Sequence, residues 1–489
     1  MKDDPRFEWI QEYREGTASA ETTSNLEGAL RDDPKFRLHF LEYLNVDGAL
    51  AARTVAVSAE MQAAGGSFSP RKERVRRVPW LPMAASMALA GLIGWGVQTV
   101  RIPFATVTSS AGSGLSQGAA LRGSALRFDV GVVEFLTRKG ARVVVEAPAE
   151  FRFESAERLR VLRGKVAADV PPEAKGFTVV TSNGSAVDLG TRFGVDVSAS
   201  AEAEIHVFQG EVIAQAKGNL TKQSLHTGEA LIMNHGVGTS RDLRSAAFIQ
   251  PDEMPQLAAG LSSGQRSRAQ ASLAGVRKDL ALIALFDFTA PEPFPGVFRM
   301  AQGRWPGSRA PEFVHTGDHL KVNVGAEQEW AQLTLAAWVR IDQLGSPYQS
   351  LYHTDGWQQE TPGQVHWMIT RDSTMRLALK GNTLAPGSIE NAGYPDSVTS
   401  VMPERGRWVH LATVYNSETK TVRFFLNGQF DKETRQEIAY PARLGAAQIG
   451  NWNREDRKLS GRMDELLLLG RALSDSEVRA LFQSGNPYR

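Results

Sequence analysis

The sequence predicts a multidomain, mainly β protein that has a short helical N-terminus and one membrane-spanning helix. Three observations support this prediction. The chain has 489 residues, which corresponds to two to four domains at the usual one to two hundred residues per domain. Residues 78–100 carry no charge. From about residue 103 onward, apolar and polar side chains alternate in short runs, which is the period of half-buried β-strands.

The composition excludes several classes of protein and of site. The 55 Lys and Arg residues nearly balance the 54 Asp and Glu residues, so the chain has no global positive field to attract nucleic acid. We therefore expect no nucleic-acid partner. The chain has no cysteine, which removes disulfides, thiolate zinc sites, cysteine nucleophiles and iron–sulfur clusters.

Residues 1–70 are predicted to form short helices. The third helix would begin at the Asp-Pro pair of residues 33 and 34, a favourable N-cap and first-turn combination. Phe36, Phe40 and Leu44 follow at four-residue spacing, which places their side chains on one helix face. Two interpretations of this apolar face stay open: a docking surface for a partner, or the core of a small self-packed bundle.

The uncharged stretch predicts a transmembrane helix over residues 79–100. As an α-helix the stretch would be about 35 Å long, whereas the hydrocarbon core of a bilayer is roughly 30 Å thick. Basic residues crowd its N-terminal flank at 71–77, and the positive-inside rule therefore places the N-terminus in the cytoplasm. The protein is thus predicted to be membrane-inserted, and everything after residue 100 to be exported. A buried helix of a soluble domain is the alternative.

The pattern of apolar and polar residues changes to that of β-strands at about residue 103. Up to residue 247, alternating runs begin seven to ten residues apart, with turns such as 163–164 and 209–210 between them. We interpret residues 103–247 as an all-β domain, either a sandwich or a short β-solenoid. Residues 250–279 have no strand period and contain two prolines and a Gly- and Ser-rich run, so they are predicted to be a linker.

Residues 280–489 are predicted to be a second β domain. Alternating or apolar runs recur along it, the last of them at 463–469. The Asn-Gly pair at 427–428 lies between two apolar runs, which is a strong signal for a tight hairpin. The Ser-Asp-Ser-Glu sequence at 474–477 is a capping box that should start a short helix ending at Gly485. We expect that helix to close one end of a β-sandwich.

No catalytic residues are predicted, and we expect the protein not to be an enzyme. Two stretches, at 114–118 and 260–264, match the Gly-x-Ser-x-Gly pattern of a nucleophile elbow, but both lie in Gly- and Ser-rich connecting sequence. Glycoside cleavage needs two acids that face each other, and Asp464 and Glu465 would point to opposite faces of a strand. His315 and His319 are four residues apart, but their surroundings indicate a loop entering a strand rather than a metal site.

Candidate ligand-binding residues lie in the second β domain, where most of the tryptophans occur. Trp357 falls in a polar loop at 353–360, where its ring could stack on a sugar. Asp355 and Trp452 complete the candidate set. The alternative is that the loop tryptophan folds back onto its own domain.

The first β domain contains motifs that carry a family resemblance. They are Val-Asp-Leu-Gly-Thr-Arg-Phe-Gly-Val at 187–195, Ile-His-Val-Phe-Gln-Gly-Glu-Val at 205–212 and Thr-Gly-Glu-Ala at 227–230. Residues 105–235 resemble the FecR domain. This resemblance implies a single-pass inner-membrane regulator whose cytoplasmic helices bind an extracytoplasmic-function sigma factor and whose periplasmic part receives a signal. Residues 16–34 look like a short anti-sigma-type N-terminus, and the absence of cysteine excludes the zinc-bearing type.

The second β domain resembles the laminin-G-like, concanavalin-type jelly roll. The matching pieces include Leu-Thr-Leu-Ala-Ala-Trp-Val at 333–339, Trp-Val-His-Leu-Ala-Thr-Val-Tyr at 408–415 and Gly-Arg-Met-Asp-Glu at 461–465. The resemblance implies a domain that binds glycans or proteins and sometimes calcium. Asp318, Asn451 and Asp464 would be the residues that offer oxygens to calcium, and no other cofactor is predicted.

Together these features predict a membrane-anchored, FecR-like signal transducer or anti-sigma regulator. Its exported jelly roll would bind an envelope or extracellular glycan or protein, and Phe36, Phe40 and Leu44 would contact the sigma factor. Two alternatives stay open. One is a structural or adhesive envelope protein that has no sigma-factor role, and the other is a jelly-roll glycoside hydrolase.

Overall fold

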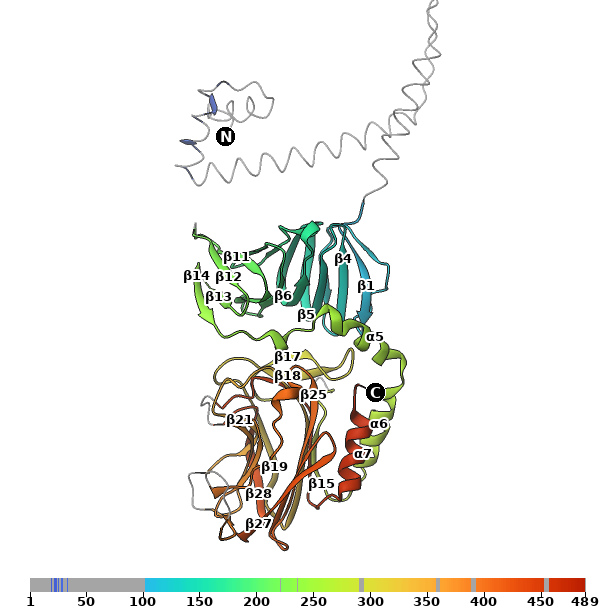
Figure 1. The fold of residues 1–489 in the computed structure, drawn as a ribbon, viewed down its shortest axis with the longest axis vertical. Coiled ribbons are helices and arrows are strands. Elements are labelled where there is room, and N and C mark those ends of the chain that lie inside the picture. Colours follow the sequence, from blue (N-terminus) through green and yellow to red (C-terminus); the bar gives the residue numbers. More distant parts are fainter. Residues whose placement is uncertain are drawn as a thin grey trace, which may run out of the picture. The chain divides into compact units, whose positions relative to one another are not determined.

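A computed structural model describes residues 102–488, apart from 220, 235, 290–293, 358–360, 388–392 and 453–456, together with residues 19, 22, 23, 25, 28, 29 and 33. The chain divides into two units, Met1–Ile93 and Gly94–Arg489. The second unit holds two β domains and a helical connection (Figure 1). Within the part of the chain that the structure describes, no helix combines the length and the apolar character needed to cross a membrane.

Little of the first unit is described. Residues 22, 23, 25, 28 and 29 are helical, and the hydroxyl of Ser19 accepts a hydrogen bond of 3.0 Å from the backbone N–H of Thr22, as an N-cap does. The predicted sigma-factor-binding residues Phe36, Phe40 and Leu44 lie outside the described residues. The predicted membrane helix at 79–100 lies outside them as well.

The first β domain is built from strands that belong to one 14-stranded sheet. Its strands are β1 (Ala105–Ala111), β2 (Ala120–Leu121), β3 (Leu126–Phe128), β4 (Val132–Thr137), β5 (Arg142–Ser155), β6 (Arg158–Asp169), β7 (Thr178–Val180), β8 (Gly184–Asp188), β9 (Arg192–Val197), β10 (Ala203–Gln209), β11 (Glu211–Ala216), β12 (Gln223–His226), β13 (Ala230–Asn234) and β14 (Val237–Arg241). The sheet branches at β6, which pairs with β5, β7 and β9. The branching lets the sheet fold around its own core.

Strand β5 shows how the sequence pattern sets this packing. In its second half, Phe151 and Phe153 are buried in the domain core while Arg152 between them is exposed, which is simple alternation. In its first half, Val143 and Val145 face the domain core, and Val144 packs instead against the segment around Phe248. Both faces of β5 are covered there, because the chain that leaves the domain returns across it.

The segment expected to be a linker is helical. After the short turns η2 (Ser245–Ala247) and η3 (Pro251–Glu253) come α5 (Met254–Ser262) and α6 (Gln265–Val276). Pro255 near the start of α5 is favourable, because a proline there costs no hydrogen bond. Gly264, with φ of 67°, separates the two helices. The two prolines and the Gly- and Ser-rich run of this stretch pointed to a linker rather than to helices.

The second β domain is a sandwich of two sheets. The nine-stranded sheet contains β15 (Leu282–Phe286), β17 (Arg299–Gln302), β18 (Arg309–Phe313), β20 (Gln332–Ile341), β24 (Thr383–Leu384), β25 (Trp408–Asn416), β26 (Thr421–Leu426), β27 (Gln429–Ile438) and β29 (Gly461–Leu469). The six-stranded sheet contains β16 (Gly296–Val297), β19 (His319–Trp330), β21 (Tyr348–Thr354), β22 (Val365–Thr370), β23 (Met375–Leu379) and β28 (Ala442–Ile449). The turn η5 (Met402–Glu404) precedes β25.

Strands β20 and β29 in the middle of the nine-stranded sheet are buried on both faces, and this explains the unbroken apolar run at the end of β29. Leu466 and Leu468 face the core between the two sheets, whereas Leu467 and Leu469 pack toward the helix α7 (Asp475–Gly485). The outer face of this sheet is covered by α6 and α7, which lie side by side (Figure 1). The expectation that the last helix closes one end of the sandwich is therefore wrong: the helix covers a sheet face, because its apolar stripe matches that face.

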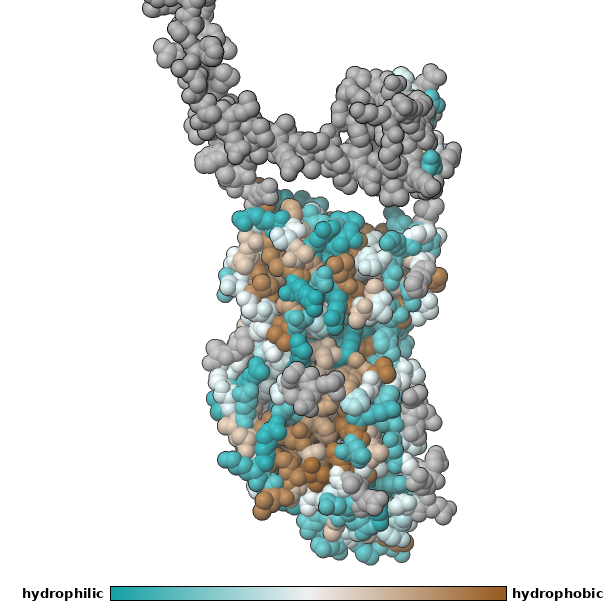
Figure 2. Space-filling model, turned by 180° about the vertical axis from the view of Figure 1, so that it is seen from behind, coloured by the Kyte–Doolittle hydropathy of each residue, from teal (hydrophilic) through white to brown (hydrophobic). Residues whose placement is uncertain are grey.

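Two local predictions are confirmed. Asn427 and Gly428, with φ of 50° and 71°, form the two-residue turn between β26 and β27. The capping box is present at the start of α7, where the Ser474 hydroxyl accepts from the backbone N–H of Glu477 and the Glu477 carboxylate accepts from that of Ser474. On the face seen in Figure 2, polar and apolar side chains are mixed over both β domains.

Candidate functional site

The candidate ligand-binding residues Trp357 and Trp452 come together around two histidines on the six-stranded sheet. His353 on β21 lies opposite His366 on β22 in the strand register. Their sequence neighbours Tyr352 and Trp367 belong to the sandwich core, so the two histidines lie on the outer face of the sheet. We refer to His353, Trp357, His366 and Trp452 as the histidine–tryptophan cluster.

The four rings are closely packed. The Trp357 ring stacks on the His366 ring with centroids 3.8 Å apart and planes 24° from parallel. The His366 ring lies 4.1 Å from the His353 ring and 4.8 Å from the Trp452 ring. The guanidinium of Arg457 lies 4.8 Å from the Trp452 ring, and the ammonium of Lys380 lies 5.7 Å from the Trp357 ring. These are cation–π distances, and they frame the cluster with two cations.

Several polar atoms of the cluster are buried without a hydrogen-bond partner in the described structure. They are both ring nitrogens of His353, Nε2 of His366 and Nε1 of Trp452. Leaving such an atom unpaired costs about 1–3 kcal/mol. Burial lowers the pKa of His353 well below its usual value, and burial together with the charge of Arg457 lowers the pKa of His366 to about 3. Both rings are therefore neutral at pH 7 and can accept or donate a hydrogen bond.

Asp355 lies next to this cluster in the sequence and holds its loop to the sheet. Its Oδ1 accepts a hydrogen bond of 2.9 Å from Nε2 of Gln448 on β28. Asp355 and Trp357 are half-buried, whereas Trp452 is 4% exposed. Flat aromatic faces beside neutral polar groups suit a ligand with an apolar face and hydroxyl groups, such as a sugar ring. Sequence reasoning named the two tryptophans but missed the histidines, because alternating polar residues in a strand are ordinary.

The three residues named for calcium have separate partners. Asp318 accepts from the backbone N–H groups of Val314 and His315, and Asn451 accepts from those of Trp452 and Arg457. Asp464, on β29 of the other sheet, accepts from the backbone N–H of Arg304. Burial raises the pKa of Asp464 to about 7. Among the described residues, the hydrogen bonds of these three share no partner.

The His315 and His319 pair forms no joint site in the described structure. His319 begins β19, as expected of a loop that enters a strand, and its Nδ1 lies 2.7 Å from the carbonyl oxygen of Gly317. His315 lies instead near Glu202 and Glu204 of the first β domain, with one ligand atom of each within 4.8 Å of the others. Glu204 is already paired with Arg244 at 2.7 Å and with Arg241.

Within the described structure a large charged cluster lies at the junction of the two β domains, and the sequence analysis assigned none of its members to a site. We call it the junction network. Its residues are Glu146, Lys165, Asp196, Glu204 and Arg244 from the first β domain and the segment that follows it, and Arg299, Glu312 and Arg462 from the second. Most of these side chains are buried, and a strand pattern alone would assign them to a solvated face.

Opposite charges alternate through the junction network. Asp196 accepts from Arg299 at 2.6 Å and lies 3.3 Å from Arg244. Glu312 accepts from Arg299, from Lys165 and, at 3.1 Å, from Arg462. Arg462 also lies 2.7 Å from Glu146. Three of these links join the two domains, namely Asp196–Arg299, Lys165–Glu312 and Glu146–Arg462.

The pKa values in the junction network follow from this alternation. Burial alone would raise the pKa of Glu312, but Arg299, Lys165 and Arg462 hold it well below its usual range. Arg299 and Lys165 likewise keep the pKa of Asp196 below its usual value against the effect of burial. The two carboxylates stay ionised at neutral pH, so the network keeps its attraction there.

Two family models match the chain. The model described as FecR protein matches residues 131–213, and the model of the concanavalin A-like lectin/glucanases superfamily matches residues 315–479. The chain therefore joins a FecR domain to a C-terminal concanavalin-like domain, as the sequence resemblances predict. No curated protein matches the chain.

Solved structures similar to parts of the chain are distant in sequence. A protein assigned as an anti-sigma factor from Parabacteroides distasonis has 18% identity and a TM-score of 0.23, with 25% of this chain and 62% of that chain covered. The botulinum neurotoxin serotype D binding domain has 11% identity and a TM-score of 0.32, with 42% and 50% covered. The heptameric SAP-like pentraxin from Limulus polyphemus has 14% identity and a TM-score of 0.26, with 42% and 83% covered.

Proposed function

We propose that this protein is a membrane-anchored FecR-like regulator whose concanavalin-like domain binds a glycan or a protein outside the cytoplasm. Its N-terminal helices would bind an extracytoplasmic-function sigma factor. The order of parts supports this proposal: an apolar face at residues 36–44, a basic flank, an uncharged stretch of transmembrane length, the FecR domain and the concanavalin-like domain. We also propose that the protein acts by binding and is not an enzyme.

The observation that carries the proposal is the junction network. A single membrane helix cannot easily transmit a subtle change of shape, so a ligand must move, cluster or expose the whole exported part. Buried ion pairs such as Lys165–Glu312 and Arg299–Asp196 join the two β domains. Breaking such pairs is costly, because each leaves an unpaired charge in a dry environment. A displacement of the ligand-binding domain would therefore be passed to the FecR domain as a rigid-body movement.

The histidine–tryptophan cluster is the proposed recognition site. Trp357, the half-buried ring of the cluster, would supply an aromatic face to the ligand, and the buried rings of His366 and Trp452 would hold it in place. Binding to a glycan array should be lost in Trp357→Ala and Trp452→Ala. Phe430→Ala, which changes a half-exposed aromatic residue on β27, is the control that should bind as the unchanged protein does.

The sigma-factor interaction is tested separately on the full-length protein solubilised from membranes. Sigma factors of the same organism should co-purify with it, and Phe40→Ala should weaken that interaction by about 2 kcal/mol, as expected for an aromatic anchor. A reporter fused after residue 250 should be active only in an exported position. Glycan binding without capture of any sigma factor would identify the protein instead as an adhesive envelope protein.

A further inference from the structure

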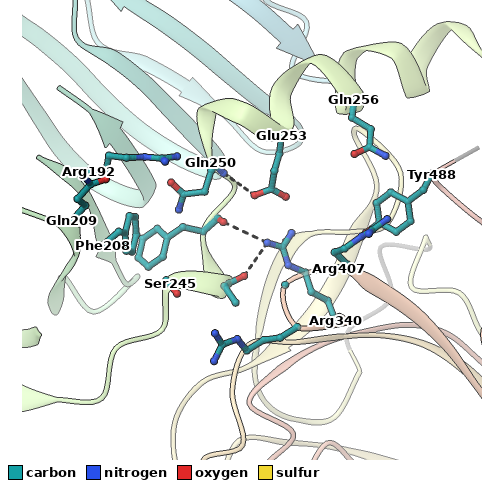
Figure 3. Close-up of a pocket in the computed structure, with 14 residues that line it drawn as sticks. Arg192, Phe208, Gln209, Ser245, Gln250, Glu253, Gln256, Arg340, Arg407 and Tyr488 are labelled. Atoms are coloured by element: carbon teal, nitrogen blue, oxygen red, sulfur yellow. Dashed lines mark hydrogen bonds between the residues drawn. The ribbon is translucent and has the colours of Figure 1, made fainter. Parts of the chain in front are cut away.

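A second cavity, apart from the histidine–tryptophan cluster, lies between the FecR domain and the concanavalin-like domain. Its volume is about 620 Å³, within the range of roughly 300–1,000 Å³ that is usual for small-molecule sites. One wall comes from β9 and β10, another from the segment 245–256, and the third from β20, the turn 405–407 and Tyr488. Side chains from all three walls point toward the same space (Figure 3).

The walls of this cavity are strongly basic. Arg192, Arg340, Arg405 and Arg407 line it, and Glu253 is the one acidic residue among the described lining residues. Arg192 has a counter-ion in Asp252 at 2.9 Å, and Arg407 lies 4.0 Å from Glu404. Arg405 is exposed and makes no ion pair within the described residues. Glu253 accepts a hydrogen bond from the backbone N–H of Gln250 as part of a capping box.

Arg340 is the buried arginine of this cavity. Its side chain is 5% exposed, yet its guanidinium bonds only to the backbone carbonyl oxygens of Ala246 at 2.9 Å and Phe248 at 3.4 Å. Within the described residues no carboxylate lies within 4.0 Å of it, and its Nε has no hydrogen-bond partner. A buried guanidinium without a carboxylate is unfavourable unless an anion reaches it. The junction network nearby shows the usual arrangement, in which each buried arginine has a carboxylate partner.

The other lining residues indicate what kind of anion fits. Guanidinium groups bind the paired oxygens of carboxylates, sulfates and phosphates through a planar fork of N–H donors. Gln209, Gln250 and Gln256 add side-chain amides, which suit hydroxyl groups, and Phe208 adds an aromatic face. Arg407 itself packs against the ring of Tyr488, 4.5 Å from its centroid, so that its charge is held toward the cavity wall.

We propose that this arginine-lined cavity binds a small molecule that carries a carboxylate, sulfate or phosphate group on a hydroxyl-bearing body. Because Arg192 belongs to the FecR domain and Arg340, Arg405 and Arg407 to the concanavalin-like domain, a bound anion would hold the two domains together. The site is independent of whatever ligand the histidine–tryptophan cluster takes, and it would respond to a different chemical signal.

The test is calorimetric titration of the full chain with glucuronate, glucose 6-sulfate, glucose 6-phosphate and glucose. The three anions separate the possible sources of charge, and glucose reports binding without charge. We expect at least one anion to bind, glucose not to bind, and the affinity to fall when salt is raised from about 50 to about 500 mM. The double variant Arg405→Gln and Arg407→Gln, which changes two exposed residues, should lower the affinity by at least about tenfold.

Two further variants make the result decisive. Arg435→Gln removes an exposed arginine on β27, away from the lining residues, and should leave anion affinity unchanged. Arg340→Lys keeps the charge but removes the planar fork, and should lower affinity while circular dichroism stays the same. The proposal fails if no anion binds better than glucose, or if the double variant binds as tightly as the Arg435→Gln protein. Failure here would leave glycan binding by the histidine–tryptophan cluster untouched.

Discussion

Lys165 on β6 of the FecR domain donates a hydrogen bond to Glu312 on β18 of the concanavalin-like domain, and both side chains are buried. The same ammonium also donates to the carbonyl oxygen of Ala247 at 3.2 Å, in the segment that connects the two domains. One lysine thus ties together three parts of the chain. Burial and the charge of Arg462 lower the pKa of this lysine, and the carboxylate of Glu312 opposes that shift.

Glu312→Gln should destabilise the junction. It leaves the charges of Lys165, Arg299 and Arg462 buried with less compensation, and removing one partner of a buried pair typically costs about 3–5 kcal/mol. Chemical denaturation should show this loss and should separate the unfolding of the two β domains into two transitions. Glu154→Gln is the control, because Glu154 pairs with arginines on the domain surface and its loss should cost within about 1 kcal/mol. Equal effects of the two changes would contradict a structural role for the junction network.

His410 should make the protein sensitive to acid. Its ring lies 5.2 Å from the Trp338 ring, and burial together with the charge of Arg304 lowers its pKa to about 3. The pKa of histidine in an unfolded chain is about 6.5, so between about pH 6.5 and 3 the unfolded state binds a proton that the folded state does not. Stability therefore falls as the pH falls through this window, by about 1.4 kcal/mol per pH unit for this residue.

The measurement is the difference in unfolding free energy between variant and unchanged protein from pH 7 to about pH 4.5. His410→Phe should reduce the acid-dependent loss, because it removes the titrating group and keeps the ring volume. His226→Gln changes an exposed histidine on β12 and should leave the slope as it was. An unchanged slope in His410→Phe would show that His410 is protonated in the folded state.

Asp464 should have the opposite pH dependence. Burial raises its pKa to about 7, whereas an aspartate in an unfolded chain titrates near 3.9. Between these values the folded state binds a proton that the unfolded state lacks, so stability contributed by this group is lost as the pH rises toward 7. Asp464→Asn keeps an acceptor for the backbone N–H of Arg304. The unfolding free energy of this variant, compared with that of the unchanged protein, should therefore be more favourable at pH 8 than at pH 5.

The same variant tests the proposed absence of catalysis. A carboxyl group with a pKa near 7 has the property of a general acid, but Asp464 is buried and bonded within its own domain. We expect the unchanged full-length protein to cleave none of a broad panel of polysaccharides. Turnover that disappears in Asp464→Asn or Glu465→Gln would instead establish a glycoside hydrolase.

Gly428→Ala should be more damaging than an alanine in an open turn of the same conformation. A Cβ at Gly428 would lie 2.7 Å from the Cβ of Phe482 on α7. Gly218 has a similar φ, 81° against 71°, and a Cβ added there would meet nothing within 4 Å, so Gly218→Ala reports the backbone strain alone. That strain is about 1–2 kcal/mol. Thermal unfolding should show a larger loss of stability for Gly428→Ala than for Gly218→Ala. Equal losses would mean that α7 moves away from the added methyl group without destabilising the protein.

Local signals in the sequence predicted local structure well. The Asn-Gly turn and the capping box of α7 depend on a few adjacent residues, and both are present. Local signals could not predict the position of α7, because an apolar stripe shows that a helix is partly buried but not which surface it packs against. Helices α5 and α6 were missed because their segment is rich in Gly, Ser and Pro.

The candidate site was predictable only in part. Trp357 could be named from the sequence because it lies in a polar loop. Its stacking partner His366 lies on β22, and only the strand register of the structure shows that the two rings meet. The junction network was hidden for a related reason. Lys165 and Asp196 occupy strand positions that would face solvent in an isolated domain, and only the packing of the second domain on that face buries them.

The place of β29 and α7 in the fold bears on when each domain can form during synthesis. The FecR domain has all its strands once residue 241 has been made. In the nine-stranded sheet, however, β29 lies between β18 and β20 and also pairs with β15. These three earlier strands therefore lack one hydrogen-bonding partner until residues 461–469 have been made. The sheet face under α7 stays uncovered until residue 485. The complete nine-stranded sheet can therefore form only late in synthesis, when β29 joins strands that lie far apart in the sequence.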